Sequence, residues 1–210
     1  MKIQSVLLLV LLLSLLVAGS IYAGVIPLKP GSTVIVTHEN GKVYAKGKTP
    51  TNVSNASAQT SYSLNETGTI LTITVQNTSP ANSGAALYAL DLALPLKLVN
   101  RTRMEATFGK FPQGTMWDGP TDKSDVLSPT GYCSFAARET ILGEINDYLK
   151  MQTNLTEGFL RPGQSGEIVL TFAAPANGNA PLPIAPVAYF LTPDPSAPQQ
   201  KRVPVAVAGK

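Results

Sequence analysis

The sequence has 210 residues, of which 44% are hydrophobic and only 14% are charged, whereas charged residues make up about a quarter of typical soluble domains. This composition excludes a charge-driven disordered chain and a long coiled coil. The formal net charge of +3 is spread along the chain without a Lys/Arg block, so nucleic acid is not an expected partner.

The N-terminal segment has the three parts of a secretory signal peptide. Lys2 precedes an uninterrupted apolar run from Val6 to Ala18, and small residues follow. We expect cleavage after Ala23 or after Ser20, of which the first is preferred, and a mature protein that is secreted or held at the cell surface. In the alternative, residues 1–23 are retained as an N-terminal anchor, and only then is a membrane a partner.

Two β-rich runs, residues 33–37 and 42–46, flank the sequence His38-Glu39-Asn40-Gly41. Asn-Gly between such runs is the strongest short-range signal for a hairpin, because both residues tolerate the positive φ of a tight turn. The pattern predicts an N-terminal hairpin over residues 33–46. The polar residues 49–60 that follow are a candidate separator between this hairpin and the rest of the chain.

Alternating apolar and polar side chains predict four further strands, since successive residues of a strand point to opposite faces of the sheet. These strands cover residues 69–77, 90–98, 103–108 and 167–172. Pro95 lies in the second of them and has no N–H group. We therefore expect that strand to lie at a sheet edge or to carry a bulge at Pro95.

One segment has a helical period instead. Apolar residues recur at three- and four-residue spacings from Ile141 to Leu149, and charged residues occupy positions between them. This pattern predicts an amphipathic helix from about 136 to 151, with Ser134 as its N-cap.

The C-terminal segment, residues 175–210, contains eight prolines. Proline removes a ladder hydrogen bond and is normally confined to edge strands, strand ends and bulges. The strands expected near residues 187–191 and 203–207 should therefore be short, and they should form sheet edges or an extended tail.

Short strands with turn residues between them predict a mainly β fold, an antiparallel β-sandwich of the immunoglobulin-like or jelly-roll type with one amphipathic helix. Residues 24–210 are expected to form a single domain, because the sequence has no internal repeat and no dense linker. With one Cys, the chain has no internal disulfide, so its stability depends on core size and backbone pairing.

Two runs carry a resemblance to a known group of proteins. They are TILTITVQNTS from Thr69 to Ser79, and LRPGQSGEIVLTF from Leu160 to Phe172. Their order resembles the strand, Asn-Thr, Leu-x-Pro-Gly-x-Ser, strand layout of extracellular immunoglobulin-like modules of bacteria and archaea, including adhesion-type modules. The resemblance implies a β-sandwich fold and a location outside the cell.

The residues able to carry chemistry are few. His38 is the only imidazole and is predicted to be a solvated turn residue, whereas a Ser-His-Asp or Cys-His site would have to use it. Cys133 is predicted to be a small buried hydrophobe, with pairing between chains or a reactive thiol as alternatives. One Cys and one His also exclude a multi-Cys or multi-His zinc site.

An acidic loop supplies the weak candidates for a metal or sugar site. Asp118, Asp122 and Asp125 are interpreted first as an exposed loop, and second as a weak calcium site built from carboxylate and carbonyl oxygens. Trp117 beside them is a candidate sugar-binding platform.

Sequons of the form N-x-[ST] are enriched. They are candidate glycan acceptors, because the modified amide must be exposed in an exported chain. The alternative is that a Ser/Thr-rich sequence contains sequons that are not used. The six acceptors are Asn52, Asn55, Asn65, Asn77, Asn100 and Asn154.

These features predict a non-catalytic secreted or cell-surface protein with an adhesion, binding or surface-structural role and no cofactor. The expected partners are other surface proteins, copies of itself, and carbohydrate. The alternative is a subunit of an extracellular filament assembled by donor-strand exchange, in which the segment from Val25 to Val36 fills the open edge of a neighbour. Its apolar N-terminus, low charge and sequons are similar to those of thread-like archaeal surface fibres. A third hypothesis is a secreted carbohydrate-active enzyme that uses the carboxylates of the acidic loop.

Overall fold

The computed structural model describes residues 24–39, 41–43, 51–53, 55–95, 97–98, 103–113, 115, 117–123, 130–137, 158–193 and 202–210. The predicted signal peptide over residues 1–23 lies outside these ranges. Within them, no helix is long and apolar enough to cross a membrane.

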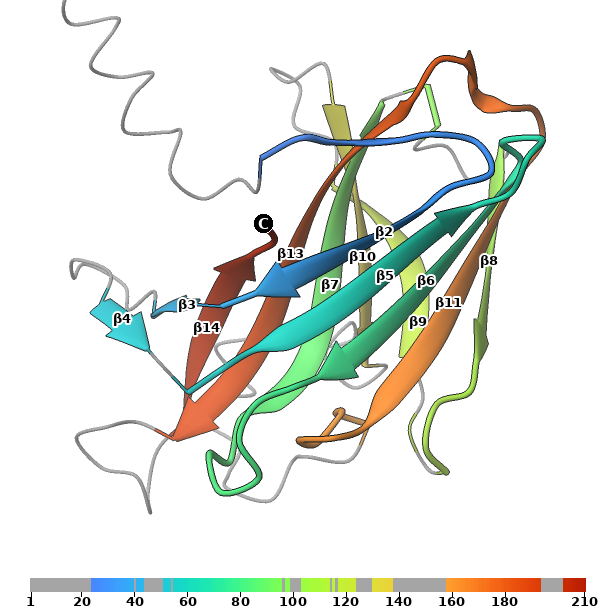
Figure 1. The fold of residues 1–210 in the computed structure, drawn as a ribbon. Helices are drawn as coiled ribbons and strands as arrows, with labels where there is room; N and C mark the ends of the chain where they lie inside the picture. The colour runs from blue at the N-terminus through green and yellow to red at the C-terminus, as the bar shows by residue number, and fades with distance from the viewer. Residues whose placement is uncertain are drawn as a thin grey trace, which may run out of the picture.

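The described chain forms two antiparallel β-sheets that face one another (Figure 1). The larger sheet has eight strands in the order β4 (Thr51–Val53), β3 (Gly41–Val43), β14 (Arg202–Ala208), β13 (Leu182–Pro193), β7 (Ala86–Pro95), β10 (Thr130–Ala137) and β9 (Trp117–Lys123), with β1 (Ile26–Leu28) paired to β13. The smaller sheet has the order β2 (Thr33–His38), β5 (Ala58–Leu64), β6 (Ile70–Asn77), β11 (Ser165–Phe172) and β8 (Met104–Gly109). A further strand, β12 (Ala176–Asn179), lies between β11 and β13 in sequence.

The core lies between the two sheets and follows from the alternation of side chains. On β6, Leu71, Ile73 and Val75 are fully buried while the residues between them face solvent or lie half-buried. Leu90 and Leu92 of β7 are also fully buried. Each such side chain contributes about 1.5–3 kcal/mol relative to an exposed one. The prediction of a mainly β fold with facing antiparallel sheets is confirmed.

The predicted hairpin over residues 33–46 is wrong. β2 pairs with β5 in the smaller sheet, whereas β3 pairs with β14 and β4 in the larger one. The chain therefore passes from one sheet to the other after β2. Sequence patterning missed β5 because its inward-facing row contains Ala58 and Thr60, which weaken the apolar signal of Tyr62 and Leu64.

The predicted helix starts inside a strand. Ala136 and Ala137 are the last residues of β10, and residues 138–151 lie outside the described ranges. Ser134 is not an N-cap, because it lies within β10 and its hydroxyl donates a 2.6 Å hydrogen bond to Asp91 Oδ1. Both side chains are buried.

The strands expected at the periphery lie inside the larger sheet. β13 has twelve residues and pairs with β1, β14 and β7. Among its prolines, Pro186 lies at the end of the ladder with β14, where its carbonyl accepts a 2.9 Å hydrogen bond from the Gly209 N–H, so the missing N–H falls at the end of that pairing. β7 is likewise interior, and Pro95 is its last residue, so the missing N–H falls at the strand end. The bulge lies elsewhere, opposite the Tyr189/Phe190 step of β13.

Candidate functional site

The outward-facing side chains of the smaller sheet form an almost uncharged surface, which we call the outer face. Each of its residues is exposed or half-buried, because the alternate residues on the same strands fill the core. The outer face consists of Thr33, Ile35, Thr37, Gln59, Ser61, Ser63, Ile70, Thr72, Thr74, Gln76, Glu105, Thr107, Ser165, Glu167, Val169 and Thr171.

Strand register places hydroxyl groups side by side on this surface. Thr72 of β6 lies between Ser63 of β5 and Val169 of β11. At the rim, Thr33 donates a 3.0 Å hydrogen bond from its hydroxyl to Ser63 Oγ. Directly opposed Cβ atoms in such pairs lie about 4.5–5.5 Å apart, so the outer face presents closely spaced small polar groups.

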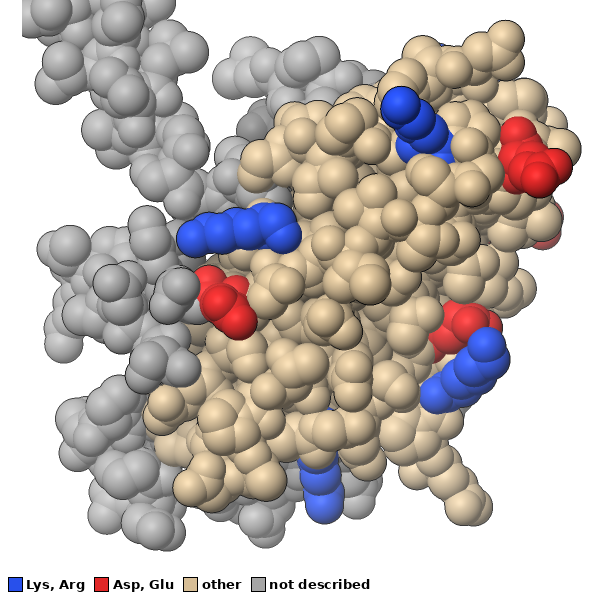
Figure 2. All heavy atoms as spheres, viewed as in Figure 1, with Lys and Arg blue, Asp and Glu red and all other residues tan. Residues whose placement is uncertain are grey.

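Charge is nearly absent from the outer face. None of its sixteen residues is Lys or Arg, although Arg103 borders it just before β8, and its two acids, Glu105 and Glu167, lie toward the β8 side. Glu167 Oε2 accepts a hydrogen bond from Lys110 Nζ at 2.6 Å, which offsets its charge. Figure 2 shows this side of the molecule with a central area free of charged side chains. Ile35 and Ile70 expose 63% and 38% of their surface there.

A surface that combines hydroxyl and amide groups with exposed isoleucines is suited to contact with another molecule. Removing water from a charged side chain costs several kcal/mol unless a partner compensates it. Contact on the outer face requires little of this desolvation, while its Ser, Thr and Gln side chains remain able to donate and accept hydrogen bonds. The outer face is therefore the candidate interaction site.

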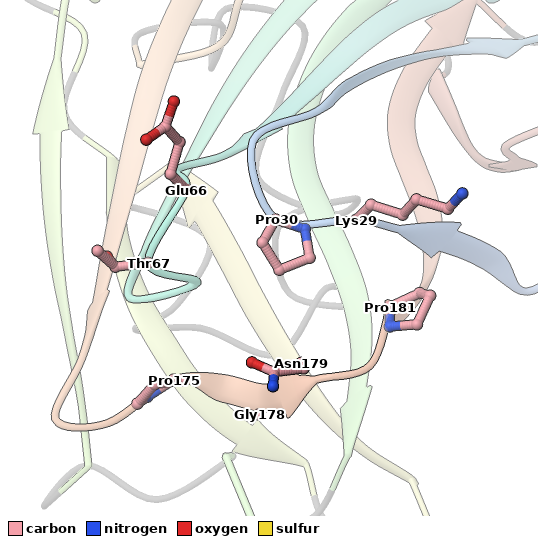
Figure 3. Close-up of a pocket in the computed structure, with 8 residues that line it drawn as sticks. All are labelled: Lys29, Pro30, Glu66, Thr67, Pro175, Gly178, Asn179 and Pro181. Atoms are coloured by element: carbon pink, nitrogen blue, oxygen red, sulfur yellow. The ribbon is translucent and has the colours of Figure 1, made fainter.

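A second concave feature lies at one end of the sandwich, between the β1–β2, β5–β6 and β11–β13 connections. This groove has a volume of about 420 Å³ and is lined by Lys29, Pro30, Glu66, Thr67, Pro175, Gly178, Asn179 and Pro181. Figure 3 shows the ammonium group of Lys29 and the carboxylate of Glu66 pointing away from one another. Three of the eight lining residues are prolines, and the two charged groups do not converge on the groove.

The interpretation of the acidic segment as a loop is wrong for residues 117–123, which form β9, while Asp125 lies outside the described residues. Asp118 is exposed on β9, and its Oδ1 accepts a 2.8 Å hydrogen bond from the Gly119 N–H. Asp122 lies on the same strand, but its side chain and all of Asp125 lie outside the description. No group of three His, Cys, Asp or Glu able to hold a metal occurs among the described residues. The weak calcium site stays a prediction.

Trp117 is a core residue, so its prediction as a sugar-binding platform is wrong. Only 6% of the residue is exposed. Its indole Nε1 donates a 3.0 Å hydrogen bond to the Gly158 carbonyl, and its ring stacks on Phe111 with 5.2 Å between centroids.

His38 is not a solvated turn residue. It ends β2 with its side chain fully buried, Nδ1 lies 3.0 Å from the Val207 carbonyl oxygen, and Nε2 lies 2.9 Å from Thr60 Oγ1. Because a carbonyl only accepts, Nδ1 carries the proton and Nε2 accepts from Thr60. Burial lowers the pKa of His38 from 6.5 to about 4, although the hydrogen bond to Val207 opposes this shift. His38 thus joins β2, β5 and β14.

The prediction that Cys133 is buried is confirmed, since the residue is inaccessible to solvent on β10. Sequence patterning did not indicate the buried Asp91–Ser134 hydrogen bond beside it. Burial, followed by the negative charge of Asp91, raises the pKa of the Tyr88 hydroxyl.

The sequons differ sharply in their environment. Asn77 is fully buried, and its Nδ2 donates to the carbonyls of Ala85 and Leu160 at 2.9 and 2.8 Å. Its prediction as an exposed acceptor is therefore wrong for the folded protein. Asn55 is exposed and Asn65 half-buried. For the remaining sequons, the side chain of Asn52 is not described, and Asn100 and Asn154 lie outside the described residues.

The fold and the outer face define a mainly β protein of two facing antiparallel sheets with an uncharged contact surface on the smaller sheet. Comparison with protein-family models, with curated proteins and with solved structures finds no match to this chain.

Proposed function

We propose that the protein is a non-catalytic secreted or cell-surface β-sandwich module, of immunoglobulin-like or jelly-roll type, whose outer face binds another surface molecule. The observation that carries this proposal is the outer face itself, a sheet surface of sixteen residues on which only Glu105 and Glu167 are charged. The role is adhesion, binding or surface structure. Glycans on accessible sequons such as Asn55 would add solubility to a chain with few charges.

The chemistry of the outer face favours a neutral partner. Cores of protein interfaces are depleted in charged residues, and the outer face already has that composition. A hydroxyl-rich carbohydrate or an uncharged protein surface would find hydrogen-bonding groups at Ser61, Thr72 and Thr74 and apolar contact at Ile35. Beside this face Arg103 lies at the rim and Lys110 is paired with Glu167, so the face offers little attraction for phosphate groups.

Placing charge at the centre of the outer face should abolish binding. We expect the double variant Ser61→Lys/Thr74→Lys to bind isolated cell envelopes at least about tenfold more weakly than the unchanged protein, because two ammonium groups would have to be desolvated in the contact. Its free energy of unfolding should fall by no more than about 1 kcal/mol, since both side chains lie outside the core and the only new strain is the repulsion of two lysines opposed across β5 and β6. Envelope co-sedimentation and thermal unfolding measure the two effects.

The matched control is Asn82→Lys/Gln113→Lys, which adds the same charge at two exposed positions outside the outer face. This control should bind like the unchanged protein. Equal binding by the outer-face variant and the unchanged protein would reject the outer face as the contact surface.

A filament assembled by donor-strand exchange is the second candidate, and the position of β1 favours it. β14 covers β13 only from Val187 to Pro193, and the three-residue β1 fills the neighbouring stretch from Leu182 to Ile184. Val25 just before β1 is 68% exposed. Within one chain β1 and β2 are both paired, so exchange would replace β1 by the same strand of a neighbour, as in domain-swapped assemblies.

Engineered disulfides show whether β13 pairs with β1 of the same chain or with β1 of a neighbouring chain. In a Cys133→Ala background, Ile26→Cys/Ile184→Cys joins register partners whose spacing suits a disulfide. Exchange predicts a covalent ladder of chains on non-reducing gels of native material, whereas a monomer with an internal disulfide would contradict it. The control pair Gln76→Cys/Ser165→Cys joins β6 to β11 and should remain monomeric in either case.

A further inference from the structure

β8 is an open edge of the smaller sheet. It lies at the rim of the fold in Figure 1 and pairs with β11, and no other strand in the described part of the chain pairs with it. In an antiparallel ladder the N–H and C=O of one residue point to the same side, and the side alternates along the strand. The Ala173 N–H donates to the Arg103 carbonyl at 2.9 Å, so the odd-numbered residues of β8 face β11. Met104, Ala106 and Phe108 therefore direct their backbone groups outward.

No backbone hydrogen bond to another described residue closes this edge. The opposite edge differs, because Thr37 of β2 exchanges hydrogen bonds with Lys210 at 3.3 and 3.0 Å. Natural edge strands are usually protected by charged side chains, by Pro or by a bulge. β8 has the sequence MEATFG and pairs with β11 in unbroken register over all six residues, so Glu105 is the one such protection on this strand.

We propose that β8 pairs with β8 of a second copy across a two-fold axis at Ala106. In this register Ala106 lies opposite its own copy, and Met104 lies opposite Phe108 of the second copy. All outward-facing backbone groups of both strands are then hydrogen-bonded, and the two five-stranded sheets become one continuous antiparallel sheet.

The side chains of β8 are compatible with this symmetric register. On the outer side, Glu105 lies opposite Thr107 of the second copy, so like charges are not directly opposed. Gly109 lies opposite Arg103 and leaves room for that long side chain. The second copy is the favoured occupant because a single register satisfies both strands at once and extends the outer face without interruption.

Proline at the two-fold position tests the pairing. Ala106→Pro removes an N–H that points away from β11, so the ladder within the chain is kept. Because one strand pair makes an interface below ~1,200 Å², we expect weak association with a dissociation constant in the micromolar range. Analytical ultracentrifugation should show a concentration-dependent dimer for the unchanged protein and for the control Ala106→Ser, and a monomer for Ala106→Pro.

A second variant keeps the test valid if Ala106→Pro does not fold. In a Cys133→Ala background, Ala106→Cys should form a disulfide-linked dimer under mild oxidation, whereas Thr33→Cys on β2 should not. A monomer at every concentration, or an unchanged dimer in folded Ala106→Pro, would overturn the proposal. The Ser61→Lys/Thr74→Lys variant should still dimerise, so failure of this pairing is distinguishable from failure of the outer face as a binding surface.

Discussion

Lowering the pH from 7 to 4 should reduce the free energy of unfolding by about 3 kcal/mol through His38 alone. The pKa of the folded imidazole is lowered to about 4, whereas the unfolded side chain has its ordinary value of 6.5. The neutral imidazole is thus favoured by folding. Its contribution is complete above pH 6.5 and is lost as the pH falls toward 4, because only the unfolded chain then gains a proton.

The geometry explains why protonation of the folded His38 ring is unfavourable. Nδ1 already donates to the Val207 carbonyl, and Nε2 accepts from the Thr60 hydroxyl. A second proton on the ring would sit on Nε2, so the Nε2–H and the Thr60 O–H would point at one another unless the hydroxyl rotated. His38 is fully buried at the point where Gly209 and Lys210 join the two sheets. Protonation should therefore loosen the junction between β2 and the C-terminal residues first.

Urea unfolding at a series of pH values measures this effect. The variant His38→Gln carries no group that titrates between pH 4 and 7 at this position, and His38 is the only histidine. The stability difference between the unchanged protein and the variant should shrink by about 3 kcal/mol between pH 7 and pH 4. A difference that does not depend on pH would contradict the assignment of His38 as the acid-sensitive group.

Replacing Asn77 with Ala should destabilise the protein by about 3 kcal/mol or more. Besides the two bonds from its Nδ2, Asn77 Oδ1 accepts a 3.0 Å hydrogen bond from the Ser79 N–H. The substitution leaves the buried Leu160 and Ala85 carbonyls without this donor, and each unpaired buried group costs about 1–3 kcal/mol. Asn77→Asp should be similarly damaging, because it places a carboxylate oxygen against two carbonyl oxygens.

Asn65→Asp is the matched control in another sequon. Asn65 Oδ1 accepts from the Thr69 and Ile70 N–H groups at 2.8 and 3.0 Å, whereas its Nδ2 makes only a 3.3 Å contact with Thr69 Oγ1. Asp keeps the two acceptor bonds, so we expect a change below about 1 kcal/mol. Denaturant unfolding of both variants measures the contrast. Equal destabilisation by Asn65→Asp and Asn77→Asp would show that the amide of Asn77 does not hold the strands together.

The apolar alternation on β6, β8 and β11 was sufficient to predict those strands, because a residue's face depends only on its position along the strand. The same alternation contained a signal for Asn77: it follows Leu71, Ile73 and Val75 in the inward row. Likewise His38 continues the inward row of Val34 and Val36. In both cases the polar side chain obscured a position that its neighbours had already defined.

The pairing of strands could not be predicted in this way. The Asn-Gly signal is local, whereas β2 pairs with a strand whose own pattern is weakened by Ala58 and Thr60. β13 can lie inside the sheet because its prolines fall at positions that the pairing with β1 and β14 tolerates. A single sequence does not reveal that pairing. The outer face also depends on strand order, because its uncharged surface exists only when β5 and β6 lie between β2 and β11.

The two sheets of this protein thus differ in what they contain and expose. The larger sheet holds the buried Asp91–Ser134 pair and accepts β1, while the smaller sheet presents the outer face and ends in the open strand β8. Pairing through β8 would double the area of outer face available for contact. Multivalent contact of this kind strengthens binding without any new interaction.

Hydroxyl-radical footprinting of the protein on native cell envelopes tests the outer face most directly, because the side chains of Ile35 and Ile70 are exposed in the free protein and report on its accessibility. Contact through the outer face predicts that both become strongly protected in the bound state, while the groove residues Pro30 and Pro181 at the end of the sandwich remain reactive. Protection confined to the groove, with Ile35 and Ile70 as reactive as in solution, would contradict the outer face as the contact surface.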